Sequence, residues 1–146
     1  MSDSSRDGPS LLVVGYDGST SSRKALAYAA GMARRERSEL VVVEVNPSGP
    51  DGTSAVDPSA GSRAGRASRA GSLTTEVAFE LEELLPGRWW VELCQGDPAT
   101  ELQRLSNDLQ SDAIVIGRAR GSVRHSVSAI AKSLIRHAHQ PVIVVP

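Results

Sequence analysis

Short, unbroken apolar runs recur along the chain, separated by longer segments in which apolar and polar residues mix. The first run is Leu-Leu-Val-Val-Gly at residues 11–15, and it shows no alternation of apolar and polar positions. Such a run is typical of a strand that is covered on both faces, as in a parallel sheet. Runs of this kind predict strands at residues 11–15, 40–45, 88–94, 112–117 and 142–145.

Between these strands, apolar residues recur at helical spacing. Thr20 or Ser21 is predicted to cap the first helix. Its apolar face consists of Ala25, Ala29, Met32 and Ala33. A second helix is predicted over residues 73–85, and a third runs from Pro98 to about Leu109 with Asp97 as its N-cap.

The last helix is predicted from a stripe that precedes Pro141. That stripe consists of Val123, Val127, Ile130, Leu134 and Ala138. Strands that alternate with helices imply an α/β fold, an open parallel sheet with right-handed crossovers and helices on both faces. The sequence therefore predicts one domain over residues 11–146, preceded by a flexible tail at residues 1–10.

The segment 46–72 differs from the rest of the chain, because Gly, Ser, Ala and Pro dominate it and apolar periodicity is lacking. We predict that it is a mobile loop. The 146 residues carry a net charge of −1, which provides no whole-molecule field for nucleic acid or an anionic membrane. A single cysteine, Cys94, excludes an internal disulfide and suits a reducing compartment. No apolar run approaches the length of a membrane span. These features predict a cytoplasmic protein with no nucleic-acid or membrane partner.

In open parallel sheets, ligands bind beyond the carboxyl ends of the strands, where the strand order reverses. The residues that follow each strand are therefore the candidates for a binding site. They are Tyr16-Asp17-Gly18-Ser19, Glu44-Val45-Asn46, Gly96-Asp97 and the segment from Gly117 to Ser122.

Four segments of the chain resemble the universal stress protein family. They are Val-Val-Gly-Tyr-Asp-Gly-Ser at 13–19, Gly-Asp-Pro-Ala at 96–99, Ser-Asp-Ala-Ile-Val-Ile-Gly at 111–117 and His-Ala-His-Gln-Pro-Val-Ile-Val-Val at 137–145. The resemblance implies a Rossmann-like sheet of the adenine nucleotide alpha hydrolase type, with five strands in the order 3-2-1-4-5. It also implies a cytoplasmic, usually dimeric protein of the stress response, and in one subgroup the binding of ATP.

Carried over to this chain, the resemblance places an adenine nucleotide in a cleft between the first and fourth strands. Asp17, beside Tyr16, would contact the adenine, and the backbone of Val45 would face the same ring. Gly117 would open the ribose and phosphate loop, since glycine lets backbone N–H groups approach phosphates. The alternative is structural: Asp17 caps the first turn or helix, and Gly117 permits a tight exit from its strand.

The phosphate segment departs from the family's pattern, which is G-x2-G-x9-G-[ST]. Here Gly117 and Gly121 are spaced by one residue more, and the final Gly-[ST] falls at Ser128-Ala129. The loss of that glycine and of the hydroxyl residue each costs about 1 kcal/mol or more of affinity. The sequence thus predicts no tightly bound cofactor, with ATP or AMP as the ligand of a weakened site.

Basic residues could compensate for this loss. Arg118 and Arg120 lie with Ser122 and Ser128 around the start of the last helix, where the helix dipole favours an anion. The alternative is a solvated basic loop. Three interpretations of function therefore remain open: a regulatory binding domain with weak or lost nucleotide binding, a nucleotide-binding protein or hydrolase with an Arg-assisted phosphate site, and a module that binds a regulatory protein partner.

Catalysis has little support in the sequence. It contains neither a G-x-S-x-G elbow nor an H-E-x-x-H motif, and Cys94 lies inside a predicted strand. We therefore expect no catalytic residue and no metal site. In the order implied by the resemblance, the last strand lies at a sheet edge, where it can pair with a second copy. The predicted homodimer interface consists of Val142, Ile143, Val144 and Val145.

Overall fold

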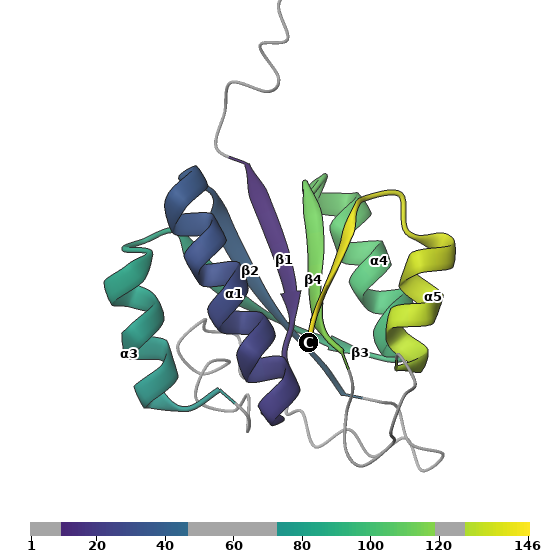
Figure 1. Ribbon diagram of the computed structural model, residues 1–146, viewed down its shortest axis with the longest axis horizontal. Coiled ribbons are helices and arrows are strands. Elements are labelled where there is room, and N and C mark those ends of the chain that lie inside the picture. Colours follow the sequence, from purple (N-terminus) through teal and green to yellow (C-terminus); the bar gives the residue numbers. More distant parts are fainter. Residues whose placement is uncertain (1–9, 47–72, 119–127) are drawn as a thin grey trace, which may run out of the picture.

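The computed structural model describes residues 10–46, 73–118 and 128–146, which form a twisted sheet between two layers of helices (Figure 1). The strands are β1 (Leu11–Gly15), β2 (Glu39–Asn46), β3 (Trp89–Gln95), β4 (Ala113–Gly117) and β5 (Val142–Val145). The helices are α1 (Thr20–Glu36), α3 (Thr75–Leu84), α4 (Pro98–Leu109) and α5 (Ala129–His137). The five strands are parallel in the order β3-β2-β1-β4-β5, as predicted.

The strand order reverses between the neighbouring strands β1 and β4. From β1 the chain adds β2 and β3 on one side of the sheet, and β4 and β5 lie on the other side. β1 pairs with β2 as far as Gly15 and Val43, and with β4 as far as Val14 and Val115. β2 and β3 continue their pairing to Asn46 and Gln95. These two strands therefore project beyond the carboxyl end of β1, next to the point of reversal.

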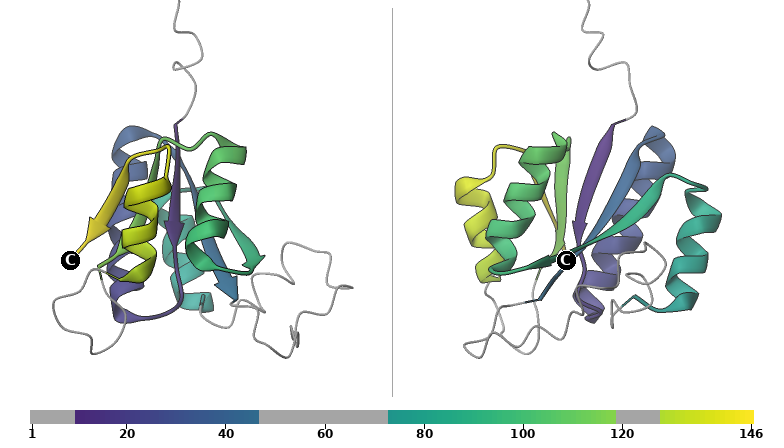
Figure 2. Two further views of the ribbon diagram at one scale, coloured as in Figure 1. Left: turned by 90° about the vertical axis from the view of Figure 1, so that its right-hand side faces the viewer. Right: turned by 180° about the vertical axis from the view of Figure 1, so that it is seen from behind.

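Helices cover both faces of the sheet (Figure 2), and each face has its own core. Leu12, Val14 and Val42 lie under the alanines of α1 and Leu81 of α3. Val13 and Val41 pack on the other face, against α4 and α5. Trp89 contacts the first core and Trp90 the second, which confirms that these adjacent aromatic residues point to opposite faces of β3.

Two helix starts differ from the predictions. The N-cap of α1 is Ser19 rather than Thr20 or Ser21, because the Ser19 side chain accepts from the Ser22 N–H. Ser128 has an extended ψ of 155° and caps α5, so a single helix does not run from residue 123 to residue 137. The stripe residues Leu134, Ile130 and Ala138 do lie in the core beside α4, whereas Val123 and Val127 lie outside the described residues.

The predicted tail (1–10) and loop (46–72) lie almost wholly outside the described residues, apart from one residue at a boundary of each. The Ser10 hydroxyl contacts that of Ser38, and Asn46 is the last residue of β2, paired with Gln95, so the strand is longer than predicted. No described helix is long and apolar enough to cross a membrane.

Candidate functional site

The turn between β1 and α1 holds two of the predicted site residues. Tyr16 is only 3% exposed and belongs to the core beneath α1, and its N–H donates to the Val43 carbonyl at 2.9 Å. Asp17 is exposed, and its Oδ1 accepts from the Ser19 N–H at 2.9 Å. Its own N–H donates to Ser22 Oγ at 3.2 Å. The carboxylate thus orders the turn, while its predicted contact with adenine remains a prediction.

Ser19 closes the first turn of α1. Its hydroxyl oxygen accepts from the Ser22 N–H at 3.1 Å, and its carbonyl accepts from the Ser22 hydroxyl at 3.0 Å. A serine whose oxygen accepts from the N3 position is a strong N-cap. The sequence does not single it out, because residues 20–22 are hydroxyl residues too and a capping box would need Glu or Gln at position 22.

Gly117 ends β4 against the first turn of α1. A Cβ at this position would lie 2.6 Å from the Ser21 carbonyl oxygen and 2.7 Å from its carbon, both of them backbone atoms. Real Cβ atoms essentially never approach backbone so closely. The glycine therefore brings the exit of β4 into direct contact with the β1–α1 turn. This fits the structural alternative, a tight exit at Gly117, whereas its partner Ser21 was not predicted.

Arg118 and Ser128 meet across the gap between the described segments. The Ser128 N–H donates to the Arg118 carbonyl at 3.1 Å, and the Arg118 N–H donates to the Val145 carbonyl at 2.8 Å. The Ser128 hydroxyl oxygen accepts from the Ala131 N–H at 3.1 Å and caps α5. The start of α5 is thereby fixed beside the ends of β4 and β5.

The remaining predicted site residues are distributed as follows. Val45 is half-buried on the part of β2 that extends past β1, and it packs toward α4. Arg120, Gly121 and Ser122 lie outside the described residues, so their predicted role stays a prediction. The structure thus brings Asp17, Gly117, Arg118 and Ser128 to the carboxyl edge around the point of reversal, with Val45 on the neighbouring strand.

Glu44 was among the candidate positions after the second strand but was not selected as a site residue. It is 7% exposed, the one charged residue among the buried residues of the described part. Two residues after Val42 along β2, it lies on the face covered by α1 and α3. Its signal in the sequence was an acidic residue inside an otherwise apolar run.

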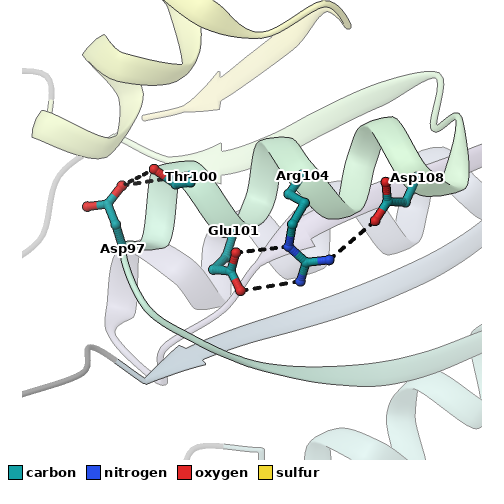
Figure 3. A network of polar contacts seen from close by, with 5 residues as sticks. All are labelled: Asp97, Thr100, Glu101, Arg104 and Asp108. Carbon is teal, nitrogen blue, oxygen red and sulfur yellow. Dashed lines mark hydrogen bonds and ion pairs between the residues drawn. The ribbon is translucent and has the colours of Figure 1, made fainter. Parts of the chain in front are cut away.

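A second strand-to-helix junction lies at the same edge, between β3 and α4 (Figure 3). Gly96 has a φ of 134°, which favours glycine, and Asp97 caps α4 before Pro98, as predicted. Asp97 Oδ2 accepts from the Thr100 N–H at 3.0 Å and from the Thr100 hydroxyl at 2.8 Å. These two hydrogen bonds lower the pKa of the Asp97 carboxyl.

Charged side chains continue along the exposed face of α4 (Figure 3). Arg104 donates from Nε and Nη2 to the two carboxylate oxygens of Glu101, at 3.0 and 3.3 Å, and from Nη1 to Asp108 at 3.2 Å. This bidentate pair with Glu101 gives the helix surface a fixed geometry but places no charge at the point of strand reversal.

The described side chains offer little for nucleophilic or metal chemistry. Burial, reinforced by Glu101, raises the pKa of the half-buried Cys94 thiol, which keeps it protonated and weakly nucleophilic at neutral pH. His137 lies at the last turn of α5, where Nδ1 is 3.0 Å from the Ser133 carbonyl. No group of His, Cys, Asp or Glu in the described segments is arranged to hold a metal ion.

The model of the universal stress protein family matches residues 11–146, and the chain belongs to this family. This confirms the resemblance seen in the sequence. Comparison with curated protein sequences gives no significant match.

Solved structures of the same family share the fold. One is a universal stress family protein from Burkholderia pseudomallei, with 26% identity, a TM-score of 0.67 and coverage of 94% of this chain and 96% of that one. Universal stress protein UspA from Lactobacillus plantarum is 16% identical, with a TM-score of 0.68 over 94% and 97% of the two chains. A universal stress protein in complex with cAMP is 19% identical, with a TM-score of 0.69 over 94% and 96%.

Proposed function

We propose that this chain is a cytoplasmic regulatory domain of the stress response that binds adenine nucleotide weakly where the sheet reverses between β1 and β4. Membership of the universal stress protein family and a structural relative in complex with cAMP support this function. The observation that carries it is the contact between Gly117 and Ser21, which places the turn of Asp17 beside the exit of β4.

The proposed site offers a negative group to the adenine and positive groups to the phosphate. The carboxylate of Asp17 can accept from the exocyclic amine of adenine, and the start of α5 offers N–H groups and the positive end of a helix dipole to a phosphate. Arg118 is exposed beside this helix start. Adenine at the β1 side and phosphate at the β4 side would therefore match the chemistry of this edge.

Weak binding is expected because Ser128 is already engaged. Its N–H donates to Arg118 and its hydroxyl oxygen accepts from Ala131, so the hydroxyl proton is what it can still offer an anion. A phosphate that needed the Ser128 N–H would have to break the bond that holds α5 to β4. The binding free energy from the new hydrogen bond would then be largely offset by the loss of the existing one.

We propose binding rather than catalysis. Phosphoryl transfer needs an acidic pair for Mg²⁺ and a group that orients the nucleophile. Asp17 is the acidic residue that the family's motifs place at the point of strand reversal, and it accepts from the Ser19 N–H. A turnover assay with ATP separates a binding domain from a hydrolase, since only the hydrolase would release phosphate in proportion to protein.

Isothermal titration with ATP, AMP and cAMP tests the binding site. We expect the purified protein to carry no nucleotide, and Asp17→Ala to weaken measured binding about tenfold, which corresponds to one lost hydrogen bond to a charged group. Asp97→Ala is the matched control, because it removes an aspartate from the same edge outside the proposed site. One nucleotide released per chain on denaturation, or equal affinity for both variants, would contradict the proposal.

We also propose a homodimer formed by antiparallel pairing of β5. In the described sheet β5 pairs with β4 along one side only, and Val142 to Val145 are each partly exposed. An apolar edge of this kind exposes backbone groups and side chains that favour pairing.

Sedimentation tests this dimer. Ile143→Asp should give a folded monomer, whereas Ile135→Asp, on the exposed face of α5, should leave the dimer intact. A wild-type monomer at micromolar concentration would overturn the proposed pairing.

A further inference from the structure

The outer side of α3 combines a large apolar side chain with acidic residues. Phe79, the only phenylalanine of the chain, is 65% exposed, and it lies opposite the buried Leu81 on the helix. Glu76 and Glu83, three residues before and four after it, share its side of α3 and are exposed. The sequence of α3 contains no basic residue.

The outer side of α1 has the complementary character. Ala27 and Gly31 are four residues apart and lie on the side of the helix opposite the buried Ala29, next to Tyr28, which is 45% exposed. Exposed basic residues bracket the two small ones along the helix: Arg23, Lys24, Arg34 and Arg35. A Cβ on Gly31 would lie 3.2 Å from Nη1 of Arg35, so this guanidinium reaches back over the small residues.

Within the described residues, no ion pair joins these opposite charges to each other. In the described ranges, the ion pairs join Arg104 of α4 to Glu101 and Asp108, and none joins α1 to α3. Both helices cover the same face of the sheet, side by side (Figure 1). Their outer sides therefore lie next to each other, basic on α1 and acidic on α3.

We infer that this surface of α1 and α3 binds a second copy of the chain, face to face about a two-fold axis. Such an axis places α3 of each copy on α1 of the other, so one contact occurs twice and closes the assembly. Phe79 would rest against Ala27 and Gly31 of the second copy, beside its exposed Tyr28. Its ring would also face the Arg35 guanidinium, which is attracted to aromatic faces.

Charge complementarity selects a second copy as the occupant. The acidic residues around Phe79 match the bases that bracket Ala27 and Gly31, and both sets belong to the same surface of the same chain. Two-fold pairing satisfies both sets together. The contact uses neither β5 nor any residue of the proposed nucleotide site, so variants of its residues test it separately from the nucleotide site and the edge-strand dimer.

The association should be weak and sensitive to salt. Exposed ion pairs each contribute little, and ions screen them over about 10 Å at 0.1 M salt. Sedimentation equilibrium of the wild-type protein up to about 1 mM covers the range of weak, transient contacts. We expect the average mass to rise with concentration in low salt and to fall when about 0.5 M NaCl is added.

A charge exchange tests the geometry directly. Glu76→Lys/Glu83→Lys makes α3 basic, and Lys24→Glu/Arg35→Glu makes α1 acidic. Each variant alone should lose the salt-sensitive association, because like charges then face each other. An equimolar mixture should recover it, with an apparent association constant at least about tenfold above either variant alone, because each mutated helix then meets its complement.

Two controls keep the result specific. Arg136→Glu changes the charge of the exposed face of α5 and should leave the association unchanged, while Phe79→Ser should weaken it without reversing a charge. Ile143→Asp, which targets the edge strand, should leave the salt-sensitive step in place. A wild-type protein with no salt-sensitive association, or a mixture that associates no better than its components, would overturn the inference.

Discussion

Two strand-to-helix junctions lie at the same edge of the sheet, and each begins with an aspartate just after its strand. At the β3–α4 junction, Asp97 is itself the N-cap and accepts two hydrogen bonds from Thr100. At the β1–α1 junction the N-cap is Ser19, and Asp17 lies two residues earlier, where its Oδ1 accepts from the Ser19 N–H. An aspartate is therefore the N-cap at one junction and precedes the N-cap at the other.

The difference separates a structural aspartate from a candidate for binding. Capping accounts for Asp97, whose carboxylate is held by the first turn of its own helix. It does not account for Asp17 in the same way, because Ser19 already caps α1. The β1–α1 junction also touches Gly117 at the point of strand reversal, whereas the β3–α4 junction belongs to an edge strand.

The largest effect is expected from Gly117→Ala, which acts on the β1–α1 junction alone. The added methyl would press on the Ser21 backbone, which cannot rotate away as a flexible side chain could. Overpacking of this kind costs about 1–3 kcal/mol, and a backbone neighbour places this case at the upper end. Urea unfolding monitored by circular dichroism measures the loss.

Gly31→Ala is the matched control within α1. Its new methyl would meet only the flexible end of Arg35, and alanine is favoured over glycine inside a helix by up to about 1 kcal/mol. The two substitutions should therefore change the free energy of unfolding in opposite directions. A neutral Gly117→Ala would show that the β1–α1 turn can shift, and that its contact with β4 does not fix the site.

The second effect compares the two aspartates. Asp97→Ala should lower the free energy of unfolding by about 1 kcal/mol, the usual cost of losing an N-cap side chain. Asp17→Ala should cost less, since Ser19 continues to cap α1. Parallel urea titrations give the order, which should be the reverse of the order expected for nucleotide affinity. A larger loss of stability for Asp17→Ala would assign that residue a mainly structural role.

Local signals explain what could be predicted from the sequence. Apolar runs located the strands, and Asp97 followed by Pro98 located the start of α4, because both features depend on neighbouring residues. The strand order came from the family resemblance, since periodicity gives elements but not their arrangement. The N-cap of α1 was predicted slightly too late in the sequence, because several hydroxyl residues stand next to one another there. Only the hydrogen bonds distinguish Ser19 as the cap.

Long-range contacts explain what could not be predicted. Position 117 needs a glycine because the Ser21 backbone leaves no room for a Cβ. Ser21 is distant in the sequence and comes close only once β1 and β4 have paired. Ser128 lies between Val127 and Ile130 of the predicted stripe, and its bond to Arg118 depends on the three-dimensional fold. The residues of the candidate site could thus be selected from motifs, but the reason why they lie together could not.

The smallest effect concerns the acid dependence of the β3–α4 junction. Hydrogen bonds from the Thr100 hydroxyl and N–H lower the pKa of Asp97 in the folded state, so the unfolded chain takes up this proton first as the pH falls. The cap therefore contributes its full stability above the ordinary pKa of aspartate, about 4, and loses it as the pH falls through the lower folded value.

Thr100→Val removes the hydroxyl donor, the larger of the two causes of the lowered pKa, and keeps the backbone donor. Carboxyl titration by NMR should then show the pKa of Asp97 moving up toward its ordinary range, while Thr75→Val, at an exposed site on α3, leaves it unchanged. An unchanged Asp97 pKa in Thr100→Val would mean that the backbone N–H alone holds this carboxylate.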